Sequence, residues 1–235
     1  KLPWKDEHDT LPTNETVARR RTLSVINRLR KDPDALQMYG DIIADQERRG
    51  FIEKVENREI NETTVHYIPH HPVKKDSTTT PIRIVFDCSC KAYPEAPSLN
   101  DCLNETPPSL NEITSILLRF RSQRYACTTD IEKAFLNIGL EDEDRDATRF
   151  FWLSDPTDPG SALETYRFKS ILFGATCSPF ILSATILKHL NSNKCEFTET
   201  LLNDLYVDNI ISSFANESRM LQYFEASRAL FDKAG

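Results

Sequence analysis

The sequence predicts a mixed α/β protein whose C-terminal half forms a split βαβ sheet with helices on one face. Residues 125–130 and 166–172 are strand-like runs, and residues 201–214 form two apolar runs around an acidic turn. Helical patterns separate and follow these runs, so the order along the chain favours one sheet covered by helices. The first third, which is mostly helical with a few strands, is expected to form a separate subdomain.

Apolar residues at helical spacing predict two helices near the N-terminus. The first covers residues 14–31 and ends at Asp32-Pro33. The second covers residues 34–49, with Gly50 as its C-terminal cap. Strands are then predicted at residues 51–55, 65–68 and 82–86, because these runs are rich in β-branched and aromatic residues.

Capping patterns place the remaining helices. Ser109 followed by Glu112 has the spacing of a capping box, which predicts a helix beginning near residue 113. Ser178-Pro179 supplies an N-cap and a first-turn proline for a helix that runs to about Leu190. A last helix is predicted over residues 217–233.

Composition gives no sign of a membrane or secreted protein. No apolar run approaches the roughly 18 residues that a membrane helix needs. The N-terminus has no apolar signal segment, so we expect an intracellular, cytoplasmic protein with no membrane partner. The six cysteines form no CxxC pair, which favours buried, reduced thiols over disulfides.

Charge limits nucleic-acid binding to local clusters. The net charge of −7 opposes phosphate binding by the chain as a whole. Basic residues nevertheless gather at residues 19–21, 28–31, 48–49, 74–75 and 119–124. Most of them are expected on solvated helix faces, with the pair Lys74-Lys75 as the exception.

Two aspartates at the ends of strands are the candidate catalytic residues. Asp130 ends one strand-like run, and Asp208 lies in the turn Tyr206-Val207-Asp208-Asn209. Carboxylates from two chain segments can share Mg²⁺, which prefers hard oxygen ligands. Such a pair suggests phosphoryl transfer. Aspartate is also common in turns, so these two residues by themselves leave a purely structural role open.

Further motifs occur in a specific order and spacing along nearly the whole chain. They are Tyr67–Val73, Arg83–Asp87, Ser98–Asp101, Leu118–Arg121, Asp130–Phe135, Phe173–Pro179 and Tyr206–Asp208. With these motifs the chain resembles the reverse transcriptase domain of LTR retroelements, and most closely that of BEL/Pao-type retrotransposons.

The resemblance implies the fingers and palm of a polymerase, with a ferredoxin-like palm sheet and no thumb. It implies an N-terminal helical region over residues 1–60 that leads into the fingers. The fingers and the start of the palm would follow over residues 61–124, and the palm with its catalytic hairpin over residues 125–235. Elements of the fingers are also allowed to interleave at residues 140–172.

The resemblance further implies a metal site and a sugar-selecting residue. Asp130, the backbone carbonyl of Ile131 and Asp208 would hold the metal. Phe135 would be the aromatic steric gate that clashes with a ribose 2′-OH and so favours deoxynucleotides. The competing interpretation of Phe135 is a core aromatic on a short helix.

A second set of residues is implied around the nucleotide. Arg83 and either Lys74 or Lys75 would contact the triphosphate, because a planar fork and a point charge both suit phosphate oxygens. Phe173 and Gly174 would line the nucleotide and template pocket. The residues implied along the template and primer are Tyr206, Val207, Ser178 and Pro179, with a structural helix cap as the competing interpretation of the last two.

These roles predict an RNA-directed DNA polymerase. It would extend a primer 3′-OH on an RNA or DNA template with dNTPs, using two Mg²⁺ ions or Mn²⁺. Its other partners would be the rest of the retroelement polyprotein, which comprises the thumb, RNase H, protease and integrase.

Asn209 departs from the family pattern, which has a second catalytic aspartate at this position. An amide keeps a carbonyl acceptor but carries no negative charge. We expect the change to lower the rate by about two orders of magnitude or more. The alternative is a catalytically inactive or domesticated module that binds nucleic acid with the same fold. A third possibility is a fragment that folds poorly.

Overall fold

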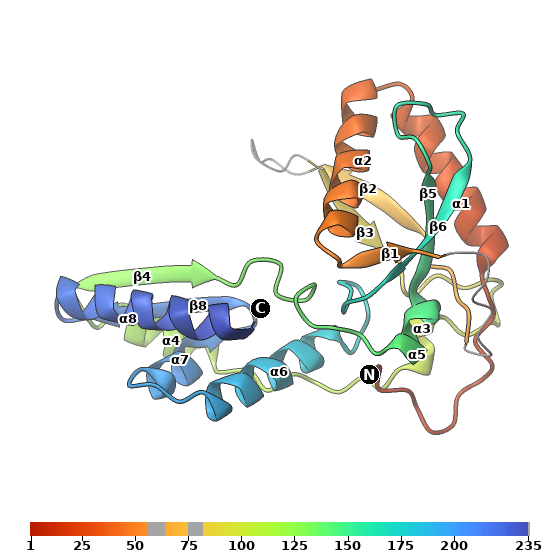
Figure 1. Ribbon diagram of the computed structural model, residues 1–235. Coiled ribbons are helices and arrows are strands. Elements are labelled where there is room, and N and C mark those ends of the chain that lie inside the picture. The colour runs from red at the N-terminus through yellow and green to blue at the C-terminus, as the bar shows by residue number, and fades with distance from the viewer. Residues whose placement is uncertain (56–63, 75–81, 235) are drawn as a thin grey trace. The chain divides into compact units, whose positions relative to one another are not determined.

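The computed structural model describes residues 1–55, 64–74 and 82–234, and these fall into two compact units (Figure 1). Unit 1 consists of Lys1–Glu105 and Gly139–Ser178. Unit 2 consists of Thr106–Ile138 and Pro179–Gly235. Each unit is therefore assembled from two separate stretches of chain.

Unit 1 combines helices with two antiparallel sheets. The strand order is β1-β6-β5 in one sheet and β2-β3 in the other. Its elements are α1 (Glu15–Leu29), α2 (Pro33–Arg48), β1 (Ile52–Lys54), β2 (His70–Lys74), β3 (Ile82–Phe86), α3 (Leu99–Cys102), α5 (Asp142–Arg145), the 3₁₀ helix η1 (Asp146–Thr148), β5 (Arg149–Leu153) and β6 (Leu163–Phe168).

The boundary between α1 and α2 confirms the predicted break. Asp32 is the N-cap of α2, and its Oδ1 accepts from the Ala35 amide at 3.2 Å. Pro33 occupies the first turn, where its missing N–H costs nothing. Helix α2 ends at Arg48, and Gly50 follows with a φ of 74°, the left-handed conformation that glycine adopts without strain.

An aromatic cluster around a buried histidine forms the centre of unit 1. His70 is fully buried and contacts the rings of Tyr39, Phe86, Phe150 and Trp152. Its Nε2 lies 2.8 Å from the Phe151 carbonyl oxygen, which can only accept, so Nε2 carries the proton. Its Nδ1 then accepts from the Tyr39 hydroxyl at 2.5 Å. Both nitrogens are satisfied only in the neutral ring. Burial disfavours the charged ring and lowers the pKa of His70 to about 4.

Unit 2 contains a three-stranded antiparallel sheet of order β4-β8-β7 with four α-helices. Its elements are α4 (Ile113–Phe120), β4 (Tyr125–Asp130), α6 (Ser178–Ser192), α7 (Thr198–Asp204), β7 (Leu205–Tyr206), β8 (Asn209–Phe214), α8 (Glu217–Phe231) and the 3₁₀ helix η2 (Asp232–Ala234). The first residue of α6, Ser178, still belongs to unit 1.

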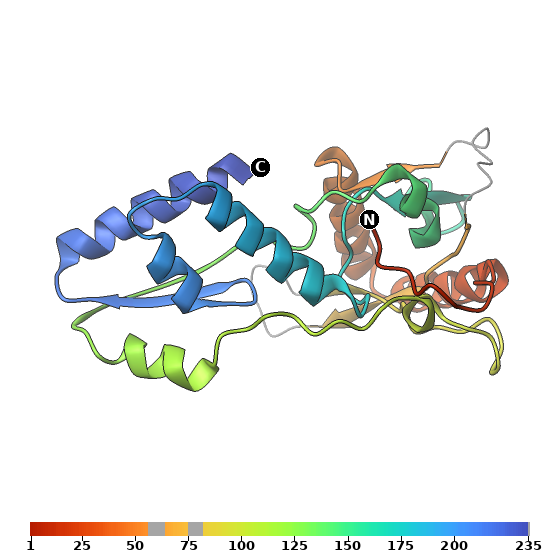
Figure 2. The same cartoon turned by 90° about the horizontal axis from the view of Figure 1, so that it is seen from below.

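The sheet of unit 2 has helices on both sides, which corrects the expected one-sided arrangement. On one side, Phe214 of β8 packs against Tyr223 of α8, with ring centroids 4.8 Å apart. The next residue back, Ser213, donates from its hydroxyl to the Arg119 carbonyl of α4 at 2.7 Å. Successive residues of a strand point to opposite faces, so α8 and α4 lie on opposite sides of the sheet, as Figure 2 shows.

The main core of unit 2 lies on the α8 side of the sheet. It joins buried residues of α6, α7, β8 and α8, and partly buried side chains from residues 131–138 pack against it. The residues that fill it include Leu182, Leu201, Ile210, Phe214 and Tyr223. The opposite face of the sheet is therefore the one on which polar side chains near the β4–β8 end reach the surface.

The predicted mixed α/β class and most of the elements are confirmed, but several boundaries are wrong. Residues 65–68 form only an isolated bridge at Tyr67, because Pro69 has no N–H with which to extend a ladder. The strand predicted at 166–172 is β6, which pairs with β1 and β5 in unit 1. The strand β5 was not predicted, because its run of buried residues lacks alternation.

Two further predictions near the hairpin need correction. The left arm predicted for residues 201–205 is the end of helix α7, and the strand β7 is only two residues long. Ser109 does not cap α4, whose N-cap is Glu112 and lacks a side-chain bond to the helix. A capping box does occur at Ser98, whose hydroxyl accepts from the Asp101 amide while the Asp101 carboxylate accepts from the Ser98 amide.

Within the described ranges, no helix is long and apolar enough to cross a membrane. All six cysteines lie in these ranges and are free, and Cys88, Cys102 and Cys177 are buried.

Lowering the pH should destabilise unit 1 through His70. The unfolded ring, with its ordinary pKa of 6.5, binds a proton that the folded ring excludes until about pH 4. The stability that depends on neutral His70 is therefore complete above pH 6.5 and is lost as the pH falls towards 4, by roughly 3 kcal/mol. Trp4 and Trp152 both belong to unit 1, so tryptophan fluorescence in urea measures its unfolding alone.

A His70→Gln variant separates this effect from the titration of carboxylates. The difference in unfolding free energy between the parent and the variant should shrink by roughly 3 kcal/mol between pH 7 and pH 4. Asn27→Gln, an exposed change in unit 1 that alters no ionisable group, is the control and should leave the pH profile unchanged. A parent profile that matches the His70→Gln profile at every pH would contradict the assignment.

Candidate functional site

The register of β4 against β8 brings Asp130 opposite Asn209. The Ile131 amide donates to the Asp208 carbonyl at 2.8 Å. A bond between the residue after Asp130 and the residue before Asn209 marks these two as a non-hydrogen-bonded pair. Their Cα atoms are therefore about 4.5 Å apart, and their side chains lie on the same face. Both side chains are exposed, on the side of the sheet opposite α8.

Asp208 lies in the two-residue turn that joins β7 to β8. Tyr206 pairs with Asn209, so only Val207 and Asp208 form the loop. Val207 has a φ of 59°, which two-residue hairpin turns require but which is strained for a β-branched residue. Such a conformation costs on the order of 1–3 kcal/mol and persists only where surrounding contacts enforce it. The turn therefore presents the Asp208 side chain at the same end of the sheet as Asp130.

Asn209 interacts directly with its neighbour in this turn. Its Nδ2 donates to Asp208 Oδ1 at 2.7 Å. Only the amide nitrogen can face a carboxylate favourably, since two facing oxygens would both be acceptors. An aspartate at position 209 would replace this bond with repulsion between two carboxylates unless a cation lay between them. The asparagine thus stabilises the turn while removing one charge from the site.

The site has two carboxylates rather than three. Among the described residues, no group of three or more histidine, cysteine, aspartate or glutamate side chains is arranged to hold a metal ion. Asp130, Asp208 and the amide oxygen of Asn209 are all hard donors. What the arrangement offers chemically is a small, acidic, solvent-accessible cluster at one end of the β4-β8-β7 sheet.

Ile131 and Phe135 follow directly after β4 in a series of turns, so Phe135 is not on the short helix considered from the sequence. The backbone of Ile131 is fixed to the hairpin through its bond to Asp208. The Phe135 side chain is half-buried and packs against the core of unit 2. Its contact with the core is compatible with either a structural or a sugar-selecting role.

Arg83 and Phe173, both in unit 1, form a stacked pair. The guanidinium carbon of Arg83 lies 4.5 Å from the centroid of the Phe173 ring. Arg83 projects from the exposed face of β3, and Phe173 is 53% exposed. A guanidinium held against an aromatic ring keeps its N–H groups aligned for a planar anion. The sequence predicted both residues but not their direct contact.

Gly174 is required by a close approach of two backbones. Its φ is 120°, and a Cβ at this position would lie 2.7 Å from the Phe86 carbonyl oxygen. The loop is also held by Asn100, whose Nδ2 donates to the Gly174 carbonyl at 3.2 Å and whose Oδ1 accepts from the Thr176 amide at 3.0 Å. Asn100 was not predicted as a site residue. It lies, however, in the stretch Ser98–Asp101, which is one of those that resemble the retroelement family.

Lys74, one of the two predicted lysines, is exposed at the end of β2. Lys74 ends β2, and its Nζ lies 3.9 Å from Asp32 Oδ2 at an exposed position. An ion pair this long and this exposed contributes little stability, so Lys74 remains available to an anion. Lys75 lies outside the described residues.

Ser178 and Pro179 begin α6 as predicted, but the serine is not its cap. Ser178 is the first residue of the helix, and its buried hydroxyl donates to the Leu172 carbonyl at 2.7 Å. The side chain therefore ties the helix start to the segment before Phe173. This bond favours the structural interpretation of Ser178.

Other polar residues around the hairpin were also missed. Asn111, Arg119, Asp204 and Ser212 make hydrogen bonds to the segment that leads into the turn or to one another. A charged residue inside an apolar run is a signal for a buried ion pair. Asp204 stood in such a run, where it was interpreted as part of a strand.

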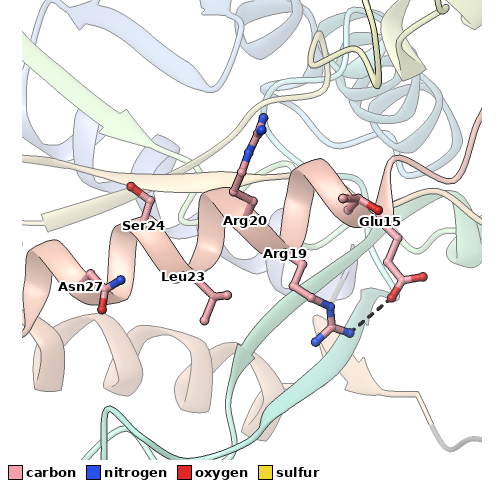
Figure 3. A pocket seen from close by; sticks show the side chains of 7 residues that line it. Glu15, Arg19, Arg20, Leu23, Ser24 and Asn27 are labelled. Atoms are coloured by element: carbon pink, nitrogen blue, oxygen red, sulfur yellow. Dashed lines mark hydrogen bonds and ion pairs between the residues drawn. The ribbon is translucent and has the colours of Figure 1, made fainter.

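A hollow of ≈ 560 Å³ lies along α1, outside the predicted site (Figure 3). It is lined by Glu15, Thr16, Arg19, Arg20, Leu23, Ser24 and Asn27. Glu15 pairs with Arg19 at 3.3 Å, so the hollow has little free charge beyond Arg20. One exposed helix face with one free cation does not define a binding site, and we assign it no chemistry.

Comparisons with solved structures identify the fold. The prototype foamy virus protease–reverse transcriptase matches 87% of this chain with a TM-score of 0.61 at 20% sequence identity. The foamy viral enzyme in complex with double-stranded DNA matches 100% with a TM-score of 0.62 at 17% identity. The fold is that of the fingers and palm of a retroviral reverse transcriptase. A third match, to the foamy viral enzyme with an RNA/DNA hybrid, covers 86% with a TM-score of 0.62 at 20% identity.

These likenesses concern the fold and a part of each neighbour. The chain spans 23% to 38% of the length of the foamy viral chains that it matches. No protein-family model matches the sequence, and no curated protein matches it.

Substituting Gly174 should destabilise unit 1. In Gly174→Ala, the new Cβ would overlap the Phe86 carbonyl and the residue would keep a φ unfavourable for alanine. We expect the unfolding free energy, measured by tryptophan fluorescence in urea, to fall by roughly 1–3 kcal/mol. Gly139→Ala is the matched control, because no atom lies within 4 Å of its added Cβ. Equal stability of the two variants would refute the close approach.

Proposed function

We propose that this chain is the fingers and palm of an RNA-directed DNA polymerase from an LTR retroelement of the BEL/Pao type. The observation that carries the proposal is the pairing of Asp130 with Asn209, which sets two aspartates from distant segments at one end of the palm-type sheet. The reverse-transcriptase fold supports it. The motifs that resemble BEL/Pao elements supply the narrower assignment.

The donor atoms at this end of the sheet fit Mg²⁺ or Mn²⁺. Asp130 and Asp208 would bind the ion through their carboxylates, and the Ile131 carbonyl is a further candidate ligand. A divalent cation bound there would activate the primer 3′-OH and neutralise charge on the leaving pyrophosphate. Asn209 holds one oxygen of the Asp208 carboxylate at 2.7 Å and so orients it. With two negative charges, the site neutralises a second ion less well than the family pattern would.

Arg83 is proposed to bind the triphosphate of an incoming dNTP, with Lys74 or Lys75 nearby along the chain. Its stacking on Phe173 restricts the guanidinium and lowers the entropic cost of binding an anion. Phe135 is proposed as the residue that disfavours a ribose 2′-OH. Gly174 contributes by the tight turn that fixes the neighbouring Phe173.

The proposed partners follow from the function. They are an RNA or DNA template with its primer, dNTPs, and the remaining domains of the retroelement polyprotein. The foamy viral structures that resemble this chain include complexes with double-stranded DNA and with an RNA/DNA hybrid.

The bond between Asn209 and Asp208 also favours a second candidate, a catalytically silent module that binds nucleic acid. This bond stabilises the turn without a cation. A chain that no longer catalyses the reaction would therefore keep the turn. This candidate predicts salt-sensitive binding to primer–template without extension.

Primer extension with Asp130 and Asn209 variants distinguishes the two candidates. On poly(rA)/oligo(dT) with Mg²⁺ or Mn²⁺, Asp130→Asn should lose at least about two orders of magnitude in rate, because one of two metal-binding charges is gone. Asn209→Asp should gain about two orders of magnitude for the opposite reason. The exposed Glu225→Gln on α8 is the matched control and should behave like the parent.

The outcomes assign the function. Activity that disappears in Asp130→Asn supports the polymerase and its metal ligands. Activity that persists in Asp130→Asn would refute the ligand assignment. If neither the parent nor Asn209→Asp extends a primer but both bind it, the silent module is favoured.

Neutralising Arg83 should weaken nucleotide binding. A hydrogen bond to a charged group contributes about 1.5–3 kcal/mol, so Arg83→Gln should raise the KM for dTTP by roughly 10- to 100-fold. Arg20→Gln, which removes an exposed arginine from α1 of the same unit, is the matched control. An unchanged KM in Arg83→Gln would show that this arginine does not contact the triphosphate.

A further inference from the structure

Helix α4 and the segment that precedes it hold the residues immediately before the catalytic hairpin. Asn111, two residues before the helix, donates from Nδ2 to the Leu202 carbonyl at 2.6 Å and to the Leu205 carbonyl at 2.9 Å. The last carbonyls of a helix have no partner within the helix. One side chain therefore satisfies the end of α7 and the first residue of β7.

Arg119, near the other end of α4, holds the same segment. Its Nε donates to Asp204 Oδ1 at 3.0 Å, and its guanidinium also donates to the Asn203 carbonyl. The Asp204 side chain is 7% exposed, and that of Arg119 is 45% exposed. An ionised carboxylate buried to this degree needs close donors, because removing it from water is costly.

The second oxygen of Asp204 extends this network into the sheet. Oδ2 accepts from the Ser212 hydroxyl of β8 at 2.7 Å, and the Ser212 oxygen lies 2.8 Å from the hydroxyl of Tyr223 on α8. Ser212 has one proton and gives it to the carboxylate, so Tyr223 donates to Ser212. Burial and the nearby Asp204 charge raise the pKa of Tyr223, which keeps its proton in place.

The hairpin needs this support because one of its arms is very short. Strand β7 has two residues, so its ladder with β8 consists of the pairs Leu205–Ile210 and Tyr206–Asn209. Two pairs cannot by themselves enforce the strained φ of Val207 or fix the register of Asp208. Asp204 lies where the ladder ends and joins β8 through its side chain instead.

We propose that Arg119 and Asp204 are positioning residues for the hairpin, and that their ion pair, passed to β8 through Ser212, replaces the missing ladder of β7 and fixes where Asp208 lies relative to Asp130. Neither residue touches the candidate site. The structural part of this inference stands on the contacts alone, whereas its consequence for catalysis rests on the proposed polymerase function.

Hydrogen exchange gives a readout that does not depend on activity. The Ile131 amide, which donates to the Asp208 carbonyl, reports whether the turn is in place. In Asp204→Asn and Arg119→Gln, its exchange should be about tenfold faster or more, while amides in the middle of α8 should exchange at the parent rate. Arg121→Gln, an exposed change at the same end of α4, is the matched control. Ser212→Ala, a milder break in the same chain of bonds, serves if a charge variant fails to fold.

Kinetics test the positioning role in a chain that polymerises, the parent or Asn209→Asp. Asp204→Asn should lower kcat about tenfold or more and leave the KM for dTTP within about twofold, because the metal-binding aspartate is displaced while the nucleotide contacts stay. Arg119→Gln should lower kcat in the same way, and Arg119→Lys, which keeps the charge, should lower it less. A double-mutant cycle should show that the effects of Arg119→Gln and Asp204→Asn do not add.

The outcomes separate this inference from the proposed function. Parent-level protection of the Ile131 amide in Asp204→Asn would overturn the inference. Lost protection with unchanged kcat would overturn the positioning role and leave a purely structural ion pair. Lost protection in a chain that never polymerises would support the role of Asp204 in holding the hairpin while overturning the proposed polymerase.

Discussion

The register between β4 and β8 is the constraint on which the candidate site depends. It places Asp130 and Asn209 side by side as a non-hydrogen-bonded pair, so Asp208 in the adjoining turn lies at the same end of the sheet. A slip of β8 by one residue would turn Asn209 to the opposite face and bury it under α8. Burial of Ile210 and Phe214 on that face makes such a slip costly, because their apolar surface would then face water. The core of unit 2 thus determines where two carboxylates meet.

Polar contacts hold the β7–β8 hairpin in addition to the apolar core. The hairpin combines a strained residue, Val207, with a strand of only two residues, and neither is stable without outside support. Support comes from α4 on one side of the sheet and α8 on the other, joined through the buried carboxylate of Asp204. Buried ion pairs are weak evidence for stability but strong determinants of geometry when every oxygen is satisfied. The position of Asp208 in the turn therefore depends on Asp204, whose carboxylate is buried.

Asn209 and Gly174 matter for different reasons, Asn209 for the charge of its side chain and Gly174 for the space at its Cα. At Asn209 the backbone matches that of an ordinary hairpin, and only the charge of the side chain departs from what two-metal chemistry favours. At Gly174 no side chain takes part, and the requirement is the space that lets the loop approach Phe86. Asn209 thus sets the charge at the hairpin end of the sheet in unit 2. Gly174 sets the path of the backbone that carries Phe173 in unit 1.

The sequence by itself determined the fold class, the strand ending at Asp130, the acidic turn at Asp208 and the break at Asp32-Pro33, because each depends on local pattern or turn chemistry. It could not determine that residues 201–204 are helical, since the same apolar residues suit a strand until Leu201 is seen packed in the core. It also could not assign β6 to the sheet of unit 1 or pair Arg119 with Asp204, 85 residues away. Such pairings depend on which distant segments meet, and that is decided only when the chain has packed.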